Sequence, residues 1–457
     1  MLKQLPKLYP IYNRLSTHGL ETPNVGERLM NEFLDQLPGG YWSDPWIKFF
    51  DPCVNRGAFL WEIFCRLDKG LEKIIPDTEK RRNHIVRNQL YGMERSESSY
   101  DIAYATFARS GYPLRNFYNE DFSKGVPKEL RKMKFDVIVG NPPYQESDGG
   151  HGASAKGIYD KFVDLAKDLD PEYISFIIPA RWHVGGKGMS KFRKTMLNDN
   201  QVSKMTVYPD SKECFPDNNI EGGICYFLWD KNKTEEECEV SISLRGEKAT
   251  SNRKLNEHGN EIFISHPVEV SILNKVLSKE ENFLNKKVSS AKPFGLRTFF
   301  KSDQKTPTKE KPIKFYQNKS IGYVGEEQLL KNIEWVDDWK VIIPKARGNQ
   351  KGKLEQLILG YPIIAGPNSA CSETYNVAGR FDNQDEAENY VKYIQTKVFR
   401  FMISIIKKTQ DAPKKVYRFV PDLDTTKVWT DEELYARYDL TQEEINFIEK
   451  RIKKIEQ

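Results

Sequence analysis

Short apolar runs alternate with helical stretches through the first 230 residues, and this alternation is the strongest constraint on the fold. Strands that alternate with helices indicate parallel βαβ units. Because several of the runs are apolar throughout, the sequence predicts a sheet that helices cover on both faces. The apolar runs span residues 46–50, 90–93, 135–139, 173–178, 204–208 and 224–229, and the helical stretches include 25–37, 58–73, 159–169 and 189–200.

The chain changes character after Asp230, where a polar, turn-rich segment begins. We therefore expect two domains, one over residues 1–235 and one over 236–457. Two T-x-x-E patterns, at residues 430–433 and 441–444, predict helix starts near the end of the chain. The second domain is expected to be mixed α+β, with further elements at residues 340–343, 361–365 and 384–397.

The positive charge is concentrated in one part of the chain. The 457 residues have a formal net charge of only +5. Residues 286–421, however, contain 25 Lys and Arg against 14 Asp and Glu. From charge alone, both a solvated lysine-rich surface and a surface that binds phosphates remain open.

The rest of the composition narrows the class of protein. With 39% hydrophobic and 30% charged residues, the chain can bury a core. It has no run of about 18 apolar residues and no secretory signal at its start, so we expect a cytoplasmic protein without a membrane span. Its six cysteines form no CxxC pair, so no structural zinc or other metal site is expected.

The segment FDVIVGNPPY, residues 135–144, is the most informative motif. Asn141, Pro142, Pro143 and Tyr144 follow an apolar strand at its carboxyl end, where open α/β sheets bind ligands. The prolines stiffen the loop. An exocyclic amino group of a base is a poor nucleophile, and acceptors from the Asn141 side chain and the Pro142 carbonyl would localise its lone pair. Tyr144 could stack on the base, and a purely structural turn is the alternative.

This segment resembles the catalytic motif of S-adenosylmethionine-dependent amino-methyltransferases, especially the N6-adenine DNA methyltransferases. The motif order is similar to that of the gamma class from restriction–modification systems. The resemblance implies a Rossmann-like methyltransferase sheet in the first domain and a target-recognition domain that binds double-stranded DNA in the second. It also allows a cognate restriction endonuclease encoded separately; a fused one is not expected, because the chain starts almost at the first cofactor motif.

The resemblance also implies where S-adenosylmethionine binds. The segment GLETPNV would close over the methionine end, and DPCVNRGAFL would be the glycine loop, with Asn55 in place of its usual first glycine. Glu94 would accept the ribose hydroxyls, Asp121 the adenine amino group, and Phe122 would stack on the adenine. The predicted cofactor-binding set is Thr22, Pro23, Asp51, Pro52, Gly57, Phe59, Glu94, Asp121, Phe122 and Asn141.

A methyltransferase that acts on a base in a duplex must flip that base out. By resemblance, Phe215 would face the flipped adenine opposite Tyr144, and the segment GIYDKF, residues 157–162, would line the pocket. The Gly- and Ser-rich residues 145–157 predict a lid, with an ordinary surface loop as the alternative. The same tetrapeptide occurs in RNA and protein-glutamine methyltransferases, and these activities, like a catalytically inactive DNA-binding subunit, remain alternatives. The candidate DNA contacts are Arg297, Lys301, Arg347, Lys351, Lys353, Lys407, Lys408, Lys414 and Lys415.

Overall fold

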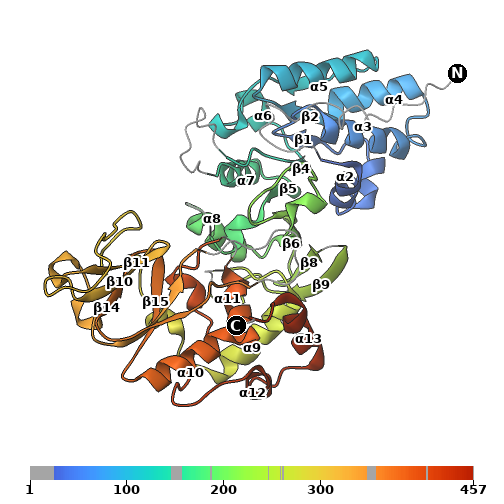
Figure 1. Ribbon diagram of the computed structural model, residues 1–457. Coiled ribbons are helices and arrows are strands. Elements are labelled where there is room, and N and C mark those ends of the chain that lie inside the picture. Colours follow the sequence, from blue (N-terminus) through green and yellow to red (C-terminus); the bar gives the residue numbers. More distant parts are fainter. Residues whose placement is uncertain are drawn as a thin grey trace. The chain divides into compact units, whose positions relative to one another are not determined.

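The chain divides into two compact units, Met1–Ser265 and His266–Gln457 (Figure 1). The computed structural model describes residues 25–145, 157–185, 188–244, 246–257, 259, 262–346, 357–407 and 410–455. None of the helices in these ranges is both long and apolar enough to span a lipid bilayer.

The first unit is built on one large sheet. Its strands are β1 (Phe49–Asp51), β2 (Leu90–Met93), β3 (Asn116–Tyr118), β4 (Val137–Gly140), β5 (Tyr173–Pro179), β6 (Val202–Tyr208), β7 (Ile224–Asp230), β8 (Cys238–Leu244) and β9 (Glu247–Arg253). Across the described residues, the strand order is β3–β2–β1–β4–β5–β7–β6–β8–β9. The first five strands are parallel, and β7 runs antiparallel to both β5 and β6.

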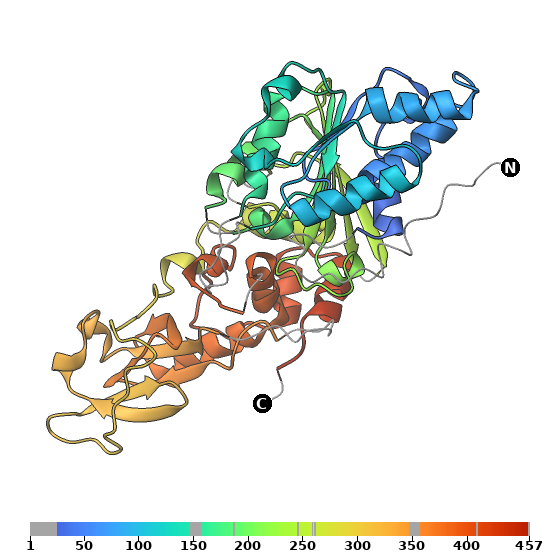
Figure 2. The same ribbon diagram turned by 90° about the horizontal axis from the view of Figure 1, so that it is seen from above.

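Helices cover both faces of this sheet, as Figure 2 shows. Successive side chains of a strand point to opposite faces, so Phe49 and Phe50 lie in two different hydrophobic cores. The core around Phe49 includes α2 (Glu27–Leu34), α3 (Ala58–Gly70) and α5 (Glu97–Arg109), and the core around Phe50 includes α7 (Tyr159–Asp168) and α8 (Ser190–Leu197). The expected α/β fold with helices on both faces is confirmed.

The polar segment after Asp230 continues the sheet instead of ending the domain. Strand β8 pairs in parallel with β6, and β9 pairs antiparallel with β8. The units therefore divide between Ser265 and His266, and not between residues 235 and 236 as the sequence suggested. The physical reason is that a strand at the edge of a sheet tolerates polar and charged side chains.

The second unit contains two small sheets. One has the order β11–β10–β14 and the other β13–β12–β15 among the described residues. Their strands are β10 (Ile313–Gln317), β11 (Ser320–Val324), β12 (Trp339–Pro344), β13 (Ile363–Ala365), β14 (Ser369–Cys371) and β15 (Tyr375–Phe381). The accompanying helices are α9 (Pro267–Lys279), α10 (Gln384–Gln395), α11 (Lys397–Ile406), α12 (Asp431–Arg437) and α13 (Gln442–Arg451).

Both predicted helix starts near the end of the chain are confirmed. Thr430 and Glu433 form a capping box at the start of α12. Thr441 and Glu444 form another at the start of α13. In each, the threonine hydroxyl accepts the backbone N–H of the glutamate, and the glutamate carboxylate accepts the backbone N–H of the threonine.

Candidate active site

The carboxyl ends of four parallel strands meet at one edge of the large sheet. Strands β3, β2, β1 and β4 are neighbours in this order. Asp51, at the end of β1, pairs in register with Gly92 of β2. Because parallel strands end at the same edge, the residues that follow them lie close together. Glu94 follows β2, Asp121 follows β3 and Asn141 follows β4.

The loop between β1 and α3 turns through two residues in the left-handed region. Asn55 has a φ of 53° and Gly57 a φ of 95°. Gly57 is the N-cap of α3, and its backbone N–H donates to the carbonyl of Val54 at 2.9 Å. Asparagine is one of the non-glycine residues that adopt a positive φ most readily. The turn therefore forms without glycine at position 55.

Glu94 joins this loop to the end of β2. Its Oε2 accepts the backbone N–H of Asn55 at 2.6 Å, and its Oε1 accepts the backbone N–H of Ser96 at 2.8 Å. The side chain is buried. Each carboxylate oxygen has two lone pairs, so each can accept a second hydrogen bond from a ligand.

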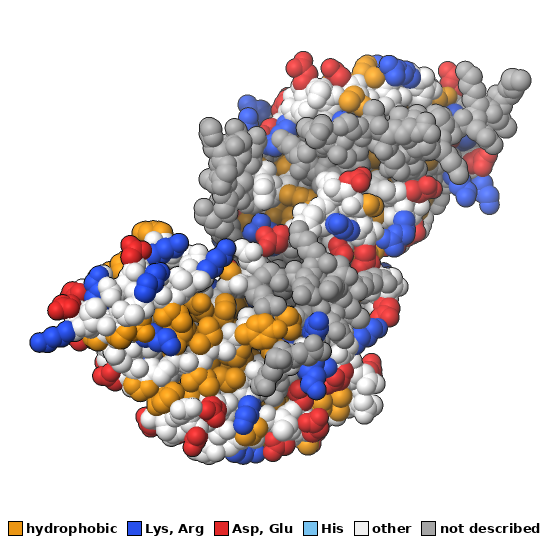
Figure 3. All heavy atoms as spheres, in the orientation of Figure 1, with side chains coloured by type: hydrophobic (Ala, Val, Ile, Leu, Met, Phe, Trp, Pro, Cys, Tyr) orange, Lys and Arg blue, Asp and Glu red, His pale blue; other side chains and the backbone are white. Residues whose placement is uncertain are grey.

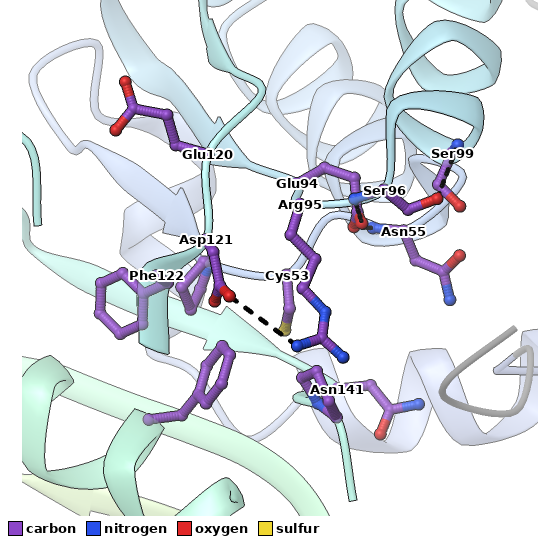
Figure 4. Close-up of a pocket in the computed structure, with 13 residues that line it drawn as sticks. Cys53, Asn55, Glu94, Arg95, Ser96, Ser99, Glu120, Asp121, Phe122 and Asn141 are labelled. Atoms are coloured by element: carbon purple, nitrogen blue, oxygen red, sulfur yellow. Dashed lines mark hydrogen bonds and ion pairs between the residues drawn. The ribbon is translucent and has the colours of Figure 1, made fainter. Parts of the chain in front are cut away.

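Asp121 and Phe122 follow β3 and face the same space. Asp121 Oδ1 accepts the backbone N–H and the hydroxyl of Ser123, at 3.0 and 2.7 Å. Its Oδ2 lies 3.9 Å from Nη1 of Arg95, which extends toward it in Figure 4. The ring of Phe122 packs 5.4 Å from that of Phe162. One side of the site is thus charged and the other aromatic.

Asn141 to Tyr144 form a buried segment after β4, with no exposed residue among the four. The preceding Gly140 lies against the β1 loop. A Cβ at Gly140 would lie 2.9 Å from both Asp51 Oδ1 and Cys53 Sγ. Only glycine lets the two loops approach so closely, so β4 presents Asn141 directly beside the β1 loop.

Burial dominates the electrostatics of the site. It raises the pKa of Asp51 to about 8, against the opposing effect of a hydrogen bond from the backbone N–H of Cys53. It also raises the pKa of the Cys53 thiol and of the Tyr144 hydroxyl. Polar interactions are strong in such a poorly solvated environment.

A pocket opens at this edge of the sheet (Figure 4). Six residues predicted from the sequence line it: Pro52, Glu94, Asp121, Phe122, Asn141 and Pro143. The other lining residues were not in the predicted set: Cys53, Asn55, Arg95, Ser96, Ser99, Glu120 and Phe162. Most of them are chain neighbours of predicted residues. Phe162, on α7, ends the segment GIYDKF, residues 157–162, whose resemblance to a family motif had indicated a place in the pocket lining.

Other predicted residues lie outside the pocket lining. Phe59 belongs to the hydrophobic core, where its ring lies 5.0 Å from that of Phe33. Phe215 is also a core residue, and the described rings include no contact between it and Tyr144. The neighbouring Cys214 is nonetheless close enough to the Tyr144 hydroxyl to raise its pKa. Asp51, Gly57 and Pro142 support the pocket without lining it, and Thr22 and Pro23 lie outside the described residues.

The predicted DNA contacts in the second unit differ in exposure. Lys407 is buried, with 4% of its surface exposed, and burial lowers its pKa to about 8. It is therefore not available to a phosphate in this structure, contrary to the prediction. Arg297, Lys301, Lys414 and Lys415 are exposed, and Arg347, Lys351, Lys353 and Lys408 lie outside the described residues, as does most of the predicted lid.

The described residues contain no group of three or more His, Cys, Asp or Glu side chains arranged to hold a metal ion. The polar groups that line the pocket include carboxylates, two amides, two serine hydroxyls and the guanidinium of Arg95.

Residues 77–215 match the family model of the Eco57I restriction-modification methylases. This span includes Glu94, Asp121 and Asn141. The resemblance to restriction-modification methylases that the NPPY motif indicated is confirmed over this span.

The chain is also 32% identical, over 261 residues, to a protein of Mycoplasma pneumoniae named an uncharacterized adenine-specific methylase. That match covers 42% of this chain and 62% of the relative, so the chain spans less than two thirds of the relative's length.

Solved structures similar to this chain are more distant in sequence. A nuclease-deletion mutant of the Type ISP restriction-modification enzyme LlaGI, in complex with a DNA substrate mimic, is 12% identical with a TM-score of 0.49, over 86% of this chain and 45% of that one. The methyltransferase subunit of a type I restriction-modification system from Streptococcus thermophilus is 14% identical with a TM-score of 0.38, over 50% of each chain.

Proposed function

We propose that this chain transfers a methyl group from S-adenosylmethionine to the N6 amino group of an adenine in double-stranded DNA. The observation that carries the proposal is the convergence of Glu94, Asp121 and Asn141 on one pocket at the carboxyl edge of the sheet. The methylase match over residues 77–215 supports the reaction class.

The residues of the pocket fit S-adenosylmethionine. Glu94 can accept the ribose hydroxyls, Asp121 can accept the adenine amino group, and Phe122 offers an aromatic face to the adenine ring. Behind the pocket, Asp51 Oδ2 is buried without a hydrogen-bond partner, and a positively charged group bound nearby would favour the ionised form of this carboxyl. When bound, S-adenosylmethionine supplies an electrophilic methyl group on a positively charged sulfur. Thr22 and Pro23 would close the methionine end.

Asn141 and Pro142 prepare the target amino group. The amide oxygen of Asn141 and the carbonyl of Pro142 accept its two hydrogens and localise the lone pair on nitrogen. Their loop is buried and stiffened by two prolines, so the acceptors hold their positions while the methyl group is transferred. Catalysis is then mostly positioning, because the nitrogen needs no strong base before it reacts.

The target adenine must leave the helix to reach this loop. Tyr144 would stack on one face of the flipped base and Phe215 would face the other. The exposed cations of the second unit, Arg297, Lys301, Lys414 and Lys415, would bind phosphates of the same duplex. Other Lys and Arg side chains are visible on the face of this unit that Figure 3 draws. A separately encoded restriction endonuclease would cleave the same unmethylated sequence.

One experiment tests the substrate. The full chain is incubated with labelled S-adenosylmethionine and, in separate reactions, with duplex DNA, RNA or a protein extract, and the labelled product is digested and identified. N6-methyladenine from DNA supports the proposal. If label appeared only in RNA or only in glutamine residues of protein, the chain would be an RNA or a protein-glutamine methyltransferase instead. If no label were transferred to DNA, RNA or protein, the proposed function would be contradicted.

A further inference from the structure

An aromatic side chain in the second unit is exposed on a turn between two cations. Phe299 has 79% of its surface exposed. The turn closes where the backbone N–H of Phe300 donates to the carbonyl of Arg297 at 3.1 Å. Arg297 and Lys301, two residues away on either side, are also exposed. Single exposed apolar side chains are common on protein surfaces, so the features that distinguish Phe299 are the two cations beside it and the fixed turn that carries it.

The first half of the turn is fixed to the loop between β14 and β15. The backbone N–H and the hydroxyl of Thr298 donate to Oε1 of Glu373, at 3.2 and 3.5 Å. In return, the backbone N–H of Glu373 donates to the carbonyl of Leu296 at 2.9 Å. A change in the backbone conformation at Thr298 that buried the Phe299 side chain would break these hydrogen bonds.

The second half of the turn is fixed to the hairpin of β10 and β11. Phe300 points inward, with its ring 5.6 Å from that of Phe315. Gln317, 1% exposed, accepts the backbone N–H of Ser302 at 2.8 Å and donates to the Ser302 carbonyl at 3.1 Å. Since Phe300 packs against the core of this unit and Gln317 holds the backbone, the turn directs Phe299 outward from a fixed support.

The charges around Phe299 indicate the class of partner. Residues 297–311 contain five Lys and Arg against two acidic residues, Asp303 and Glu310. The Glu373 carboxylate, which contacts the turn, accepts the backbone N–H of Thr298. An exposed aromatic ring between cations suits a polyanion with flat apolar surfaces, which describes stacked bases between phosphates. A protein partner would need an acidic surface around an apolar pocket, a rarer combination.

We propose that Phe299 is a wedge that enters duplex DNA between neighbouring bases, while Arg297 and Lys301 bind the phosphates beside it. The ring replaces part of the stacking that is lost when the bases separate. The rigid turn limits the conformational entropy lost on binding. This inference rests on the proposed function, because that function makes duplex DNA the substrate.

The test compares variants of the full chain on a plasmid and on sheared mixed-sequence duplex DNA, so that the recognition sequence need not be known. Affinity is measured by fluorescence anisotropy over a range of salt concentrations. Insertion is measured as the change in linking number after the plasmid is relaxed by a topoisomerase in the presence of the protein. Phe299→Ala removes the wedge, Phe299→Trp retains an aromatic ring, and Arg297→Ala removes one phosphate contact.

The matched control is Trp46→Ala. Trp46 lies in the first unit, is also 79% exposed, and belongs to no part of the proposed machinery. It reports what the loss of an exposed aromatic side chain does by itself. Since Phe299 and Trp46 are both exposed, neither substitution should impair folding, and circular dichroism checks this.

Phe299→Ala should weaken binding roughly tenfold with an unchanged salt slope, because base stacking on an aromatic ring does not involve counterions. It should also abolish the change in linking number, which Phe299→Trp and Trp46→Ala retain. Arg297→Ala should instead reduce the salt slope by about one. If Phe299→Ala bound DNA as tightly as the wild type and changed the linking number equally, the proposed insertion of Phe299 would be wrong, although DNA binding by the chain would still be supported. If the wild-type chain bound no duplex DNA, the proposed function would fall as well.

Discussion

Oε2 of Glu94 accepts the backbone N–H of Asn55 at 2.6 Å, so the end of β2 fixes the turn that follows β1. The same carboxylate accepts the backbone N–H of Ser96, at the start of α5. Glu94 therefore orients two loops of the pocket as well as offering acceptors to a ligand. An acid that only bound ribose hydroxyls would need neither bond.

Substitution of Glu94 should therefore affect the empty protein as well as the bound one. In Glu94→Gln, the amide nitrogen would face a backbone N–H, and one charge-assisted hydrogen bond would be lost at a cost of about 1.5–3 kcal/mol. The free energy of unfolding, measured by urea denaturation, should fall, and calorimetry should show at least a tenfold loss of S-adenosylmethionine affinity. Glu97→Gln, at an exposed acid in the first turn of α5, is the control. If Glu94→Gln bound S-adenosylmethionine more weakly but had an unchanged free energy of unfolding, Glu94 would contact the ligand without stabilising the two loops.

Asn141→Ala should separate transfer from cofactor binding. The variant loses the side-chain acceptor for the target amino group, and we expect methyl transfer to fall by on the order of a hundredfold or more. Cofactor affinity should be largely retained, because Glu94, Asp121 and Phe122 are unchanged. Single-turnover kinetics and calorimetry measure the two quantities. Turnover like that of the wild type would remove Asn141 from the mechanism.

Asp51 should make stability depend on pH. Its folded pKa is raised to about 8, whereas an unfolded aspartate has a pKa of about 3.9. Between these values the folded state binds one proton more than the unfolded state, so the free energy of unfolding falls as the pH rises. Asp51→Asn keeps an acceptor for the Cys53 N–H and removes the titrating group.

The Asp51→Asn variant should therefore gain stability relative to the wild type between about pH 5 and pH 8. Chemical denaturation of both proteins at several pH values measures this difference. Parallel curves across that range would show that Asp51 ionises at its ordinary pKa.

Gly140→Ala tests the close approach of the β1 and β4 loops. The new methyl carbon would lie 2.9 Å from Asp51 Oδ1 and Cys53 Sγ, so one loop must move. We expect a loss of about 1–3 kcal/mol in the free energy of unfolding, typical of overpacking, together with weaker S-adenosylmethionine binding. Gly40→Ala is the control, since a Cβ at Gly40 would have no neighbour within 4 Å. Equal stability in the two variants would show that the contact is not tight.

The apolar strands were predictable because their signal is local. The run at 90–93 coincides with β2, and the run at 173–178 falls within β5. Strand β3 was missed, because its three residues form no pattern and two of them are only half-buried. The direction of β7 could not be predicted either, since it depends on a hairpin-like connection from β6 that contains no helix of four residues or more.

The site was predictable where a residue directly follows a strand, as Glu94 and Asn141 do. Phe162 reaches the pocket from α7, so only the resemblance of residues 157–162 to a family motif indicated it. Charge counting was also incomplete, since it treats every cation as exposed. Lys340, Arg400 and Lys407 are buried, and the Lys340 ammonium donates to backbone carbonyls, among them those of Trp335 and Val336. Burial is a property of the folded chain that a count of charges does not contain.

The turn at Asn55 shows that this loop requires a dihedral angle and not a particular residue. A φ of 53° is open to asparagine at a small cost, and the bond from its N–H to Glu94 helps to offset that cost. Sequence patterns that demand glycine at this position would exclude this chain although its backbone has the left-handed conformation there. A search profile that weights residues by their tolerance of positive φ would retrieve such divergent members.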